Sequence, residues 1–315
     1  MLRIAITGAS GFIGKHLVPK LIANGHDIRL ATRASLSGDR NISGQFRIDL
    51  VTATDIEFGL FLDGCDVLIH LAGEVTDQAK MRTLHVDATR RLAEAATATR
   101  LAHWVQLSSC GVYGPVRSGV ISESAPKSPV GEYEVTKWES EEVVREWSEI
   151  SGRKATILRP SIVWSADMPN GSLRALIAAV RRGMFFFIGK PGGVYPCVHV
   201  DDLVAAVIMA TERGGGNLRV FNLSDNVPIE YLIGTIAELF GRSPPRLRVP
   251  QSLARAVARF VPALPLTTSR IDALTTRAIY SSKDAYKLLG WQPQKSLREG
   301  LRELAGVIAE NGGII

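Results

Sequence analysis

A tyrosine and a lysine four residues apart, Tyr133 and Lys137, are the residues of this chain best suited to moving a proton. In a helix, this spacing places both side chains on one face. A lysine ammonium one turn away favours the tyrosinate, so we expect Lys137 to draw the pKa of Tyr133 toward neutrality. A phenol with such a pKa can pass a proton to or from a carbonyl oxygen.

A Tyr/Lys pair with this spacing is common on amphipathic helices. It indicates a catalytic function only in combination with two serines earlier in the chain. Ser108 and Ser109 lie at the end of an apolar run that starts at Trp104. Such a run is typical of a buried strand, and parallel sheets bind ligands at the carboxyl ends of their strands. We therefore expect Ser109, Tyr133 and Lys137 to form one proton-transfer site.

The segment Thr7–Gly14 places three glycines between the first strand pattern and the first helical pattern. Gly8 allows a tight turn, Gly11 lets the backbone approach a pyrophosphate, and Gly14 lets the helix pack on the strand. Free N–H groups at the helix N-terminus then bind phosphate. Three glycines would also suit a turn without a ligand, but the strand-turn-helix context predicts a dinucleotide site. Its expected contacts are Gly8, Ser10, Gly11, Phe12, Ile13 and Gly14.

The end of the second strand bears on which dinucleotide binds. A carboxylate there would accept hydrogen bonds from a ribose 2′-hydroxyl, whereas a cation would pair with a 2′-phosphate. This chain has Thr32-Arg33 and no acid at that point. A guanidinium binds phosphate bidentately, which favours NADP over NAD. The alternative is that Arg33 is a solvated surface residue or stacks on the adenine.

The elements that position these residues alternate between short apolar runs and longer helical patterns. This alternation predicts a doubly wound, Rossmann-type α/β fold, a parallel sheet with helices on both faces. Strands are expected at Arg3–Thr7, Asp27–Thr32, Phe46–Asp49, Asp66–Leu71, Trp104–Ser108, Ala155–Leu158 and Val220–Leu223. Helices are expected at Phe12–Ala23, His85–Arg100, Tyr133–Ile150, Leu173–Arg182 and Asp201–Glu212, the last capped by its aspartate.

The sequence pattern changes after Arg159-Pro160, where Gly/Pro-rich loops flank a basic helical segment. We expect an NAD(P)-binding domain made of residues 1–160 and about 199–226. Residues 161–198 and 227–315 would form a smaller, mostly helical substrate-binding lobe. The aromatic run Phe185-Phe186-Phe187 is expected in the core of this lobe, or else in a substrate-lining or lipid-facing patch.

Composition excludes several classes of protein. The net charge of +6 suits an anionic ligand and plain solubility equally, and the scattered arginines argue against nucleic acid as a partner. Three distant cysteines and six histidines without ligand spacing predict a reducing compartment, no disulfide framework and no metal. No apolar stretch is long enough to span a bilayer, and no signal peptide precedes the first strand. We therefore expect a cytoplasmic protein, with visits to a membrane surface left open.

Taken together, the motifs resemble those of the extended short-chain dehydrogenase/reductases, in particular the NAD-dependent epimerase/dehydratase family that acts on nucleotide sugars. The resemblance covers nearly the whole chain. It runs through Thr7–Gly14, His70–Gly73, Leu107–Gly114, Tyr133–Lys137, Leu158–Pro160, His199–Asp202, Leu288–Pro293 and Leu297–Leu301.

The resemblance implies a role for each matching residue. Ser109 would be the catalytic serine, Tyr133 the acid/base and Lys137 the residue that holds the nicotinamide ribose. Asp49-Leu50 would lie near the adenine, and Leu71-Ala72-Gly73 along the pyrophosphate and ribose. Family members commonly form homodimers, and the helices that match here are His85–Arg100 and Tyr133–Ile150.

The chain departs from the family at three places. His85 stands where an Asn-x-x-Gly-Thr segment would begin, and we expect it to be a surface residue. Tyr195-Pro196-Cys197 precedes His199 where nucleotide-sugar enzymes often place a phosphate-binding arginine, which weakens a UDP-sugar assignment. Arg277 falls where a second such arginine would lie, with a surface role as the alternative.

The third departure concerns the reaction. The family's 4,6-dehydratases keep an acid pair beside the serine or threonine, and here those places hold Cys110 and Gly111, which cannot do carboxylate work. Cys110 is expected to be a packed side chain, and His199 a hydrogen-bonded structural residue. Dehydration is therefore disfavoured, unless Glu123 or Asp167 reaches the site from elsewhere.

The expected function is a nucleotide-sugar 4-epimerase or 4-ketoreductase, of a kind used in polysaccharide biosynthesis. One alternative is an NADPH-dependent reductase of a non-sugar ketone, such as a flavonoid- or steroid-like substrate. Another is a protein that binds the dinucleotide without turnover. The complete set of Ser109, Tyr133 and Lys137 argues against the last of these.

Overall fold

A seven-stranded parallel sheet forms the centre of the molecule, whose computed structural model describes residues 1–33, 42–169, 171–214, 216–260 and 266–310. Its strand order is β11-β7-β5-β4-β1-β2-β3. The order reverses between β1 and β4, and open parallel sheets bind their ligands at such a switch point. The strands are β1 (Arg3–Thr7), β2 (Asp27–Thr32), β3 (Ile42–Arg47), β4 (Val67–His70), β5 (His103–Leu107), β7 (Lys154–Pro160) and β11 (Leu218–Leu223).

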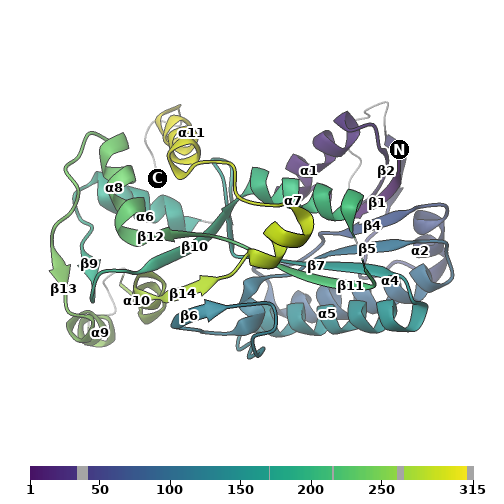
Figure 1. Cartoon of the computed structure of the whole chain (residues 1–315), viewed down its shortest axis with the longest axis horizontal. Coiled ribbons are helices and arrows are strands. Elements are labelled where there is room, and N and C mark those ends of the chain that lie inside the picture. The colour runs from purple at the N-terminus through teal and green to yellow at the C-terminus, as the bar shows by residue number, and fades with distance from the viewer. Residues whose placement is uncertain (34–41, 170, 215, 261–265, 311–315) are drawn as a thin grey trace.

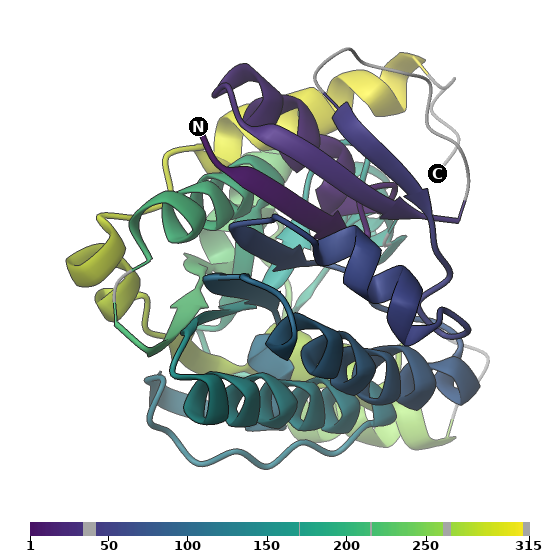
Figure 2. The same cartoon turned by 90° about the vertical axis from the view of Figure 1, so that its right-hand side faces the viewer.

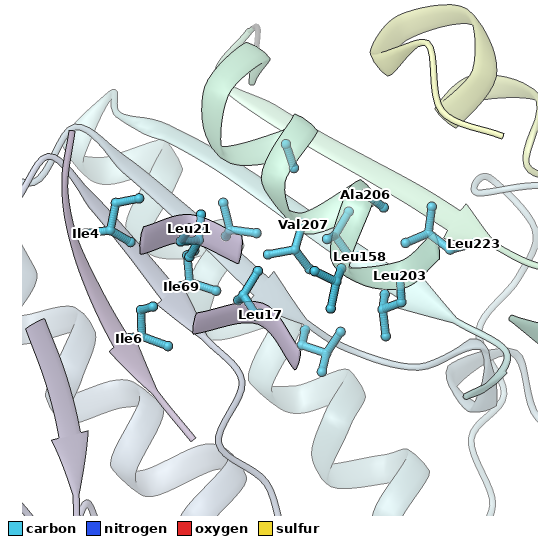
Figure 3. Close-up of a cluster of buried hydrophobic side chains, with 14 of the residues drawn as sticks. Ile4, Ile6, Leu17, Leu21, Ile69, Leu158, Leu203, Ala206, Val207 and Leu223 are labelled. Carbon is cyan, nitrogen blue, oxygen red and sulfur yellow. The ribbon is translucent and has the colours of Figure 1, made fainter. Parts of the chain in front are cut away.

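Helices cover both faces of this sheet, as its continuous apolar strands require. On one face lie α1 (Phe12–Ala23) and α7 (Val200–Arg213), and on the other α2 (Asp55–Leu62), α4 (Ala88–Thr97) and α5 (Glu132–Ser151) (Figures 1 and 2). Figure 3 shows the first face, where leucines and valines of α1 and α7 lie over the side chains of the strands. The predicted fold class, a Rossmann-type α/β sheet, is therefore confirmed.

Two local expectations are wrong. The third strand begins at Ile42 rather than Phe46, because it pairs with β2 from Ile28 onward. The helix predicted to begin at His85 is a short helix α3 (Gln78–Arg82), a π-helical turn η1 (Thr83–Asp87) and then α4. The π-helical turn turns the side chain of His85 inward, which sequence periodicity does not reveal.

The cap of α7 is also different from the expected aspartate. His199 precedes the helix, and its Nδ1 accepts a hydrogen bond from the backbone N–H of Asp201 at 3.2 Å. The carboxylate of Asp201 instead pairs with Lys20 of α1 at 2.7 Å. Asp202 accepts the backbone N–H of Gln294 at 2.9 Å. Both acids are thus engaged by partners outside the helix, and His199 takes the structural role expected of it.

A smaller assembly lies beside the carboxyl ends of the large sheet (Figure 1). It contains a three-stranded sheet of β8 (Ile162–Trp164), β10 (Val194–His199) and β12 (Asp225–Pro228), and a two-stranded sheet of β9 (Phe187–Ile188) and β13 (Arg248–Val249). Its helices are α6 (Gly171–Arg181), α8 (Ile229–Leu239), α9 (Gln251–Phe260), α10 (Thr268–Thr275) and α11 (Leu297–Glu310). Phe185, Phe186 and Phe187 are half-buried against its apolar clusters.

Two connections tie the smaller assembly to the large sheet. Strand β14 (Arg277–Tyr280) pairs with β6 (Ser118–Ile121), which precedes α5 in the chain. Trp291, just beyond the π-helical turn η3 (Ala285–Leu289), is buried in the cluster under α7 and donates its indole N–H to the carbonyl of Asp202 at 2.8 Å. The domain boundaries expected from the sequence stay a prediction. None of the helices among the described residues is long and apolar enough to cross a membrane.

Candidate active site

Ser109 stands directly after β5, at the carboxyl edge of the sheet, and begins the short helix η2 (Cys110–Tyr113). Its Oγ accepts a hydrogen bond from the backbone N–H of Gly111 at 3.0 Å. Its neighbour Ser108 points the other way, into the protein, where its hydroxyl donates to Glu141 at 2.5 Å. The two consecutive serines after β5 therefore point in different directions: Ser109 faces the site, and Ser108 faces the core.

Tyr133 lies in the first turn of α5, and the side chain of Ser109 is near enough to favour the phenolate of Tyr133. Its ring meets the ring of His85 edge-on, with the centroids 5.7 Å apart. The expectation that Lys137 lowers the pKa of Tyr133 is wrong for this structure. Burial raises the pKa of Tyr133 to about 12, and the carboxylate of Glu134 adds to the rise. Loss of hydration has the largest effect, because the charged phenolate is the form that suffers from it.

Lys137 lies one turn further along α5 and is buried. Its ammonium donates a hydrogen bond to the carbonyl of Leu107 in β5 at 3.0 Å. Burial lowers the pKa of Lys137 to about 8, against the opposing attraction of Glu141. A Cβ atom on Gly73 would lie 3.4 Å from the Lys137 nitrogen, so this glycine leaves room beside the ammonium.

His85 is not the surface residue expected from the sequence, since only 1% of it is exposed. Its Nε2 accepts the backbone N–H of Glu74 at 2.8 Å, and its Nδ1 lies 2.8 Å from the hydroxyl of Thr136. That hydroxyl donates its own proton to the carbonyl of Glu132, so the proton between the two side chains belongs to Nδ1 of His85. Burial lowers the pKa of His85 to about 3, with a contribution from Lys137, and the ring is neutral.

A second buried histidine, His70, is the last residue of β4. Its ring nitrogens contact the hydroxyls of Thr7 at 2.5 Å and Thr89 at 3.0 Å. Thr89 in turn donates to the carbonyl of His85 at 2.6 Å. Burial lowers the pKa of His70 to about 3. Neutral histidines and threonines thus connect the glycine-rich turn after β1 with α4 and α5.

The glycine-rich turn has the geometry that the sequence predicted. Gly8 has a φ of +73°, and a Cβ there would lie 2.7 Å from the backbone nitrogen of Ala72. A Cβ on Gly14 would lie 2.4 Å from the carbonyl oxygen of Gly8. Gly11 caps α1 without a side-chain hydrogen bond, which leaves the first N–H groups of the helix for a ligand. These features fit the pyrophosphate of a dinucleotide.

The residues expected at the adenosine end lie at the edge of the described region. Arg33 is exposed directly after β2, and residues 34–41 lie outside the described residues. Asp49 is exposed and accepts the backbone N–H of Val51 at 3.0 Å, whereas Leu50 is buried. Lys80 of α3 is close enough to Arg33 for the two cations to repel each other. The ammonium of Lys80 is itself paired with Asp77 at 2.7 Å.

Behind Ser109 and Tyr133 lies a buried ion pair that sequence reasoning missed. Arg159 and Glu141 are both fully buried, and the guanidinium donates to both carboxylate oxygens at 2.8 and 2.5 Å. Arg159 also donates to the hydroxyl of Tyr113 at 2.8 Å. The thiol of Cys110 donates to the carbonyl of Arg159 at 3.1 Å, away from Ser109, and burial raises the pKa of this thiol. Cys110 is thus the packed side chain that was expected.

The two carboxylates that could have replaced a dehydratase acid are engaged elsewhere. Glu123 accepts the backbone N–H of Asn222 at 2.8 Å, and Asp167 pairs with His16 at 3.1 Å. A different carboxylate reaches the site. The side chain of Glu134 lies over Gly111, where an added Cβ would be 2.8 Å from its Cγ and 3.3 Å from the Oγ of Ser109. Only a glycine at position 111 leaves space for it.

Strand β10 contains Tyr195-Pro196-Cys197, where nucleotide-sugar enzymes of the family often have a phosphate-binding arginine. It carries no lysine or arginine. Tyr195 and Cys197 of β10 are both buried. Arg277 is exposed at the start of β14 and donates to the carbonyls of Lys190 at 3.0 Å and Pro191 at 2.8 Å. Arg277 therefore stands beside the loop after β9, with its guanidinium partly engaged. Within the described residues, no group of three His, Cys, Asp or Glu side chains could hold a metal ion.

Comparison of the sequence and the fold with known proteins identifies relatives of this chain. The model of the NAD dependent epimerase/dehydratase family matches residues 4–224. A UDP-glucose 4-epimerase of Mycolicibacterium smegmatis is 28% identical over 95% of this chain and 96% of its own. A 4-hydroxy-2-methyl-3-oxo-4-farnesyl-3,4-dihydroquinoline-1-oxide ketoreductase of Stigmatella aurantiaca is 28% identical over 82% of this chain and 79% of its own. The structure of UDP-glucuronic acid 4-epimerase from Bacillus cereus with NAD has the same fold, with a TM-score of 0.74 at 21% identity, over 98% of this chain and 99% of that one.

The buried bridge made by His85 can be tested by substitution. His85→Ala leaves the N–H of Glu74 and the hydroxyl of Thr136 without this partner, so we expect a loss of about 1–3 kcal/mol in the free energy of unfolding. Urea unfolding followed by circular dichroism measures it. His16→Ala, which removes a half-exposed histidine paired with Asp167, is the matched control and should change stability by less than about 0.5 kcal/mol. Equal effects of the two substitutions would contradict the bridge.

The pKa of Lys137 near 8 gives the site a pH dependence. We expect dinucleotide affinity to fall as pH rises through about 8, because the ammonium loses its proton there. Isothermal titration between pH 6.5 and 9.5 measures the dissociation constant. Lys137→Met should bind more weakly and lack this pH dependence, whereas Lys287→Met, on an exposed lysine, should behave as wild type. Persistence of the pH dependence in Lys137→Met would assign it to another group.

Proposed function

Since this chain belongs to the NAD-dependent epimerase/dehydratase family, we propose that it is a nucleotide-sugar 4-epimerase or 4-ketoreductase. The chain is an NAD(P)-dependent enzyme of the extended short-chain dehydrogenase/reductase type. The observation that carries the proposal is the placement of Ser109 at the carboxyl end of β5 and of Tyr133 in the first turn of α5, with the buried ammonium of Lys137 bound to the carbonyl of Leu107. A UDP-glucose 4-epimerase aligned over almost the full length of the chain supports the substrate class.

In the proposed reaction, Tyr133 donates a proton to the carbonyl oxygen of the substrate, or takes it from the hydroxyl in the reverse direction. When bound, NAD(P) donates or accepts the hydride at the substrate carbon that bears this oxygen. Ser109 can donate the single proton of its hydroxyl to the same substrate oxygen. A pKa of about 12 keeps the proton on Tyr133 at neutral pH, which suits the reducing direction. Positive charge brought beside the phenol would lower this pKa for the oxidising direction.

We propose that the reaction expels no water. Elimination needs an acid for the leaving hydroxyl and a base for the neighbouring carbon. The thiol of Cys110 faces the carbonyl of Arg159, and Gly111 has no side chain. Glu134 brings one carboxylate beside Ser109, which leaves the second group of such a pair unfilled.

A second candidate is the reduction of an apolar ketone with NADPH. The observation that favours it is the apolar character of β10, where Tyr195 and Cys197 stand in place of a cation that would bind a nucleotide diphosphate. The relative in Stigmatella aurantiaca is named as a ketoreductase of a farnesylated quinoline oxide. The two candidates share the same proton shuttle and differ only in what lies beyond the reacting carbon.

A panel of nucleotide sugars, each with and without NADPH, tests the proposed function by mass spectrometry of the products. We expect either an isomer of unchanged mass without net consumption of NADPH, or a change of two hydrogens with stoichiometric consumption. A product lighter by one water would contradict the reaction class. Inactivity on every sugar, together with NADPH oxidation by a farnesylated or steroid ketone, would favour the second candidate.

Variants assayed on the same panel assign the roles. Tyr133→Phe should abolish turnover and leave dinucleotide binding nearly intact, since it removes only the proton-transferring oxygen. Ser109→Ala should cost about two to three powers of ten in kcat, as for one oriented donor. Glu134→Gln should keep more than a tenth of the wild-type rate, because the proposed reaction needs no carboxylate. Retention of that much activity by Tyr133→Phe would remove this tyrosine from the mechanism.

We further propose that the chain prefers NADP, because Arg33 is exposed directly after β2, where a cation would meet a 2′-phosphate. A bidentate charged contact to a 2′-phosphate is worth about 1.5–3 kcal/mol, or roughly ten- to hundredfold in affinity. Arg33→Ala should reduce the preference for NADP by that factor, measured by titrating both dinucleotides. Arg47→Ala, on the neighbouring strand β3, serves as the control. A wild type that prefers NAD would overturn the assignment.

Dimerisation through α4 and α5 and a cytoplasmic location stay predictions.

A further inference from the structure

The positive charge of the chain is concentrated in one part of it. Residues 171–198 and 227–275 contain ten Lys and Arg but only three Asp and Glu, a net charge of +7. The whole chain carries +6, so the remainder is close to neutral. Most of these residues form α6, α8, α9, α10 and the β9–β13 pair, at the end of the molecule opposite α2 and α4 (Figure 1).

The three acidic side chains of this part are already neutralised by arginines. Glu230 pairs with Arg248 at 2.9 Å, Glu238 with Arg298 at 2.5 Å, and Asp272 with Arg255 at 2.5 Å. Four other arginines are exposed and form no ion pair within the described part of the chain, namely Arg182, Arg242, Arg246 and Arg259. This end of the molecule therefore presents cationic groups that are available to an anionic surface.

Helix α9 adds an apolar face to this charge. Its inner side packs through Ala254 and Ala258 against Ile188 and Ile271. Its outer side carries Leu253, Ala256 and Phe260, whose spacing of three and four residues places them on one face. Leu253 is 54% exposed and Phe260 77%. The guanidinium of Arg259 lies 5.9 Å from the ring centre of Phe260, so charge and apolar surface adjoin.

Two further exposed apolar side chains precede the strands β9 and β13. Met184 and Leu247 are 60% and 65% exposed, just before β9 and β13. Because β9 and β13 are parallel, both residues stand at the same end of the pair, and α9 follows from the other end of β13. We define the α9 surface as Leu253, Phe260, Met184, Leu247 and the arginines 182, 242, 246 and 259.

Exposed leucine and phenylalanine flanked by arginines are the features of a helix that lies in a membrane interface. A second copy of this chain would meet the same positive charge, which disfavours self-association here. Nucleic acid would use the arginines but leave the apolar side chains without a partner. We propose that the α9 surface docks on an anionic lipid membrane, with Leu253 and Phe260 inserted among the headgroups and the arginines at the phosphates. This goes beyond the proposed function and does not depend on it.

Helix α2 provides a matched control. It also exposes two apolar side chains on one face, Ile56 at 75% and Leu60 at 60%. Leu60 stands beside the carboxylates of Asp55, Asp63 and Glu94. The arginines near this helix are engaged, Arg91 with Asp55 and Arg29 with the carbonyls of Leu60 and Asp63. If apolar exposure alone caused binding, both helices would contribute equally. If binding needs apolar exposure together with positive charge, only α9 would contribute.

Co-sedimentation of the full chain with vesicles tests the proposal. We expect binding to vesicles that contain 30% phosphatidylglycerol, little binding to pure phosphatidylcholine, and weakening as salt rises, because the contact is partly electrostatic. The variant Leu253→Glu/Phe260→Glu should bind at least tenfold more weakly, and so should Arg182→Ser/Arg242→Ser/Arg246→Ser. Ile56→Glu/Leu60→Glu should bind as wild type.

Circular dichroism and thermal melting of each variant show that it is folded, and dinucleotide affinity shows that the site is intact. Equal binding to both vesicle types, no binding to either, or wild-type binding by the Leu253→Glu/Phe260→Glu variant would overturn the proposal. Competition by duplex DNA that is unaffected by Leu253→Glu/Phe260→Glu would assign the surface to nucleic acid instead. Because none of these measurements involves turnover, the outcome is separate from that of the proposed reaction.

Discussion

The geometry of the active site depends on the buried ion pair between Arg159 and Glu141. Both side chains are fully buried, and removing one partner of such a pair leaves an unpaired buried charge that costs about 3–5 kcal/mol. Glu141 stands one turn beyond Lys137 on α5, and Arg159 lies in β7 next to β5. The pair therefore fixes the rotation of α5 against the sheet, and with it the side on which Tyr133 and Lys137 face Ser109. The hydroxyl of Ser108 joins the same carboxylate, so the strand end and the helix share one anchor.

A second constraint comes from neutral side chains. The network that runs from Thr7 through His70 and Thr89 to His85 and Thr136 contains no net charge, yet it connects the phosphate-binding turn with the catalytic helix. Each histidine has a defined proton position, because its threonine partners donate or accept in only one sense. The network reaches Tyr133 through His85, whose ring lies edge-on to the ring of the tyrosine.

The sequence predicted the features that depend on chain order, and it missed those that depend on burial. The strands were recognisable because continuous apolar runs are required wherever helices cover both faces. The convergence of Ser109 with Tyr133 and Lys137 followed from where parallel strands end. The inward position of His85 depends on a π-helical turn that has no periodic signal. The raised pKa of Tyr133 depends on lost hydration rather than on sequence neighbours. Glu134 adjoins Tyr133 in sequence, but only the missing side chain of Gly111 lets it lie beside the serine.

The buried histidines also limit the acidity that this fold can withstand. Burial lowers the pKa of His70 and His85 to about 3, whereas an unfolded chain protonates both near 6.5. Between these values the unfolded chain holds more protons than the folded one, so acid favours unfolding. Each histidine removes about 1.4 kcal/mol of stability per pH unit below 6.5, and the two together about twice that. Acid would thus inactivate the protein through loss of its structure before it altered the chemistry of Tyr133. An acidic vacuole or a strongly acidified medium is an environment for which this architecture is poorly suited.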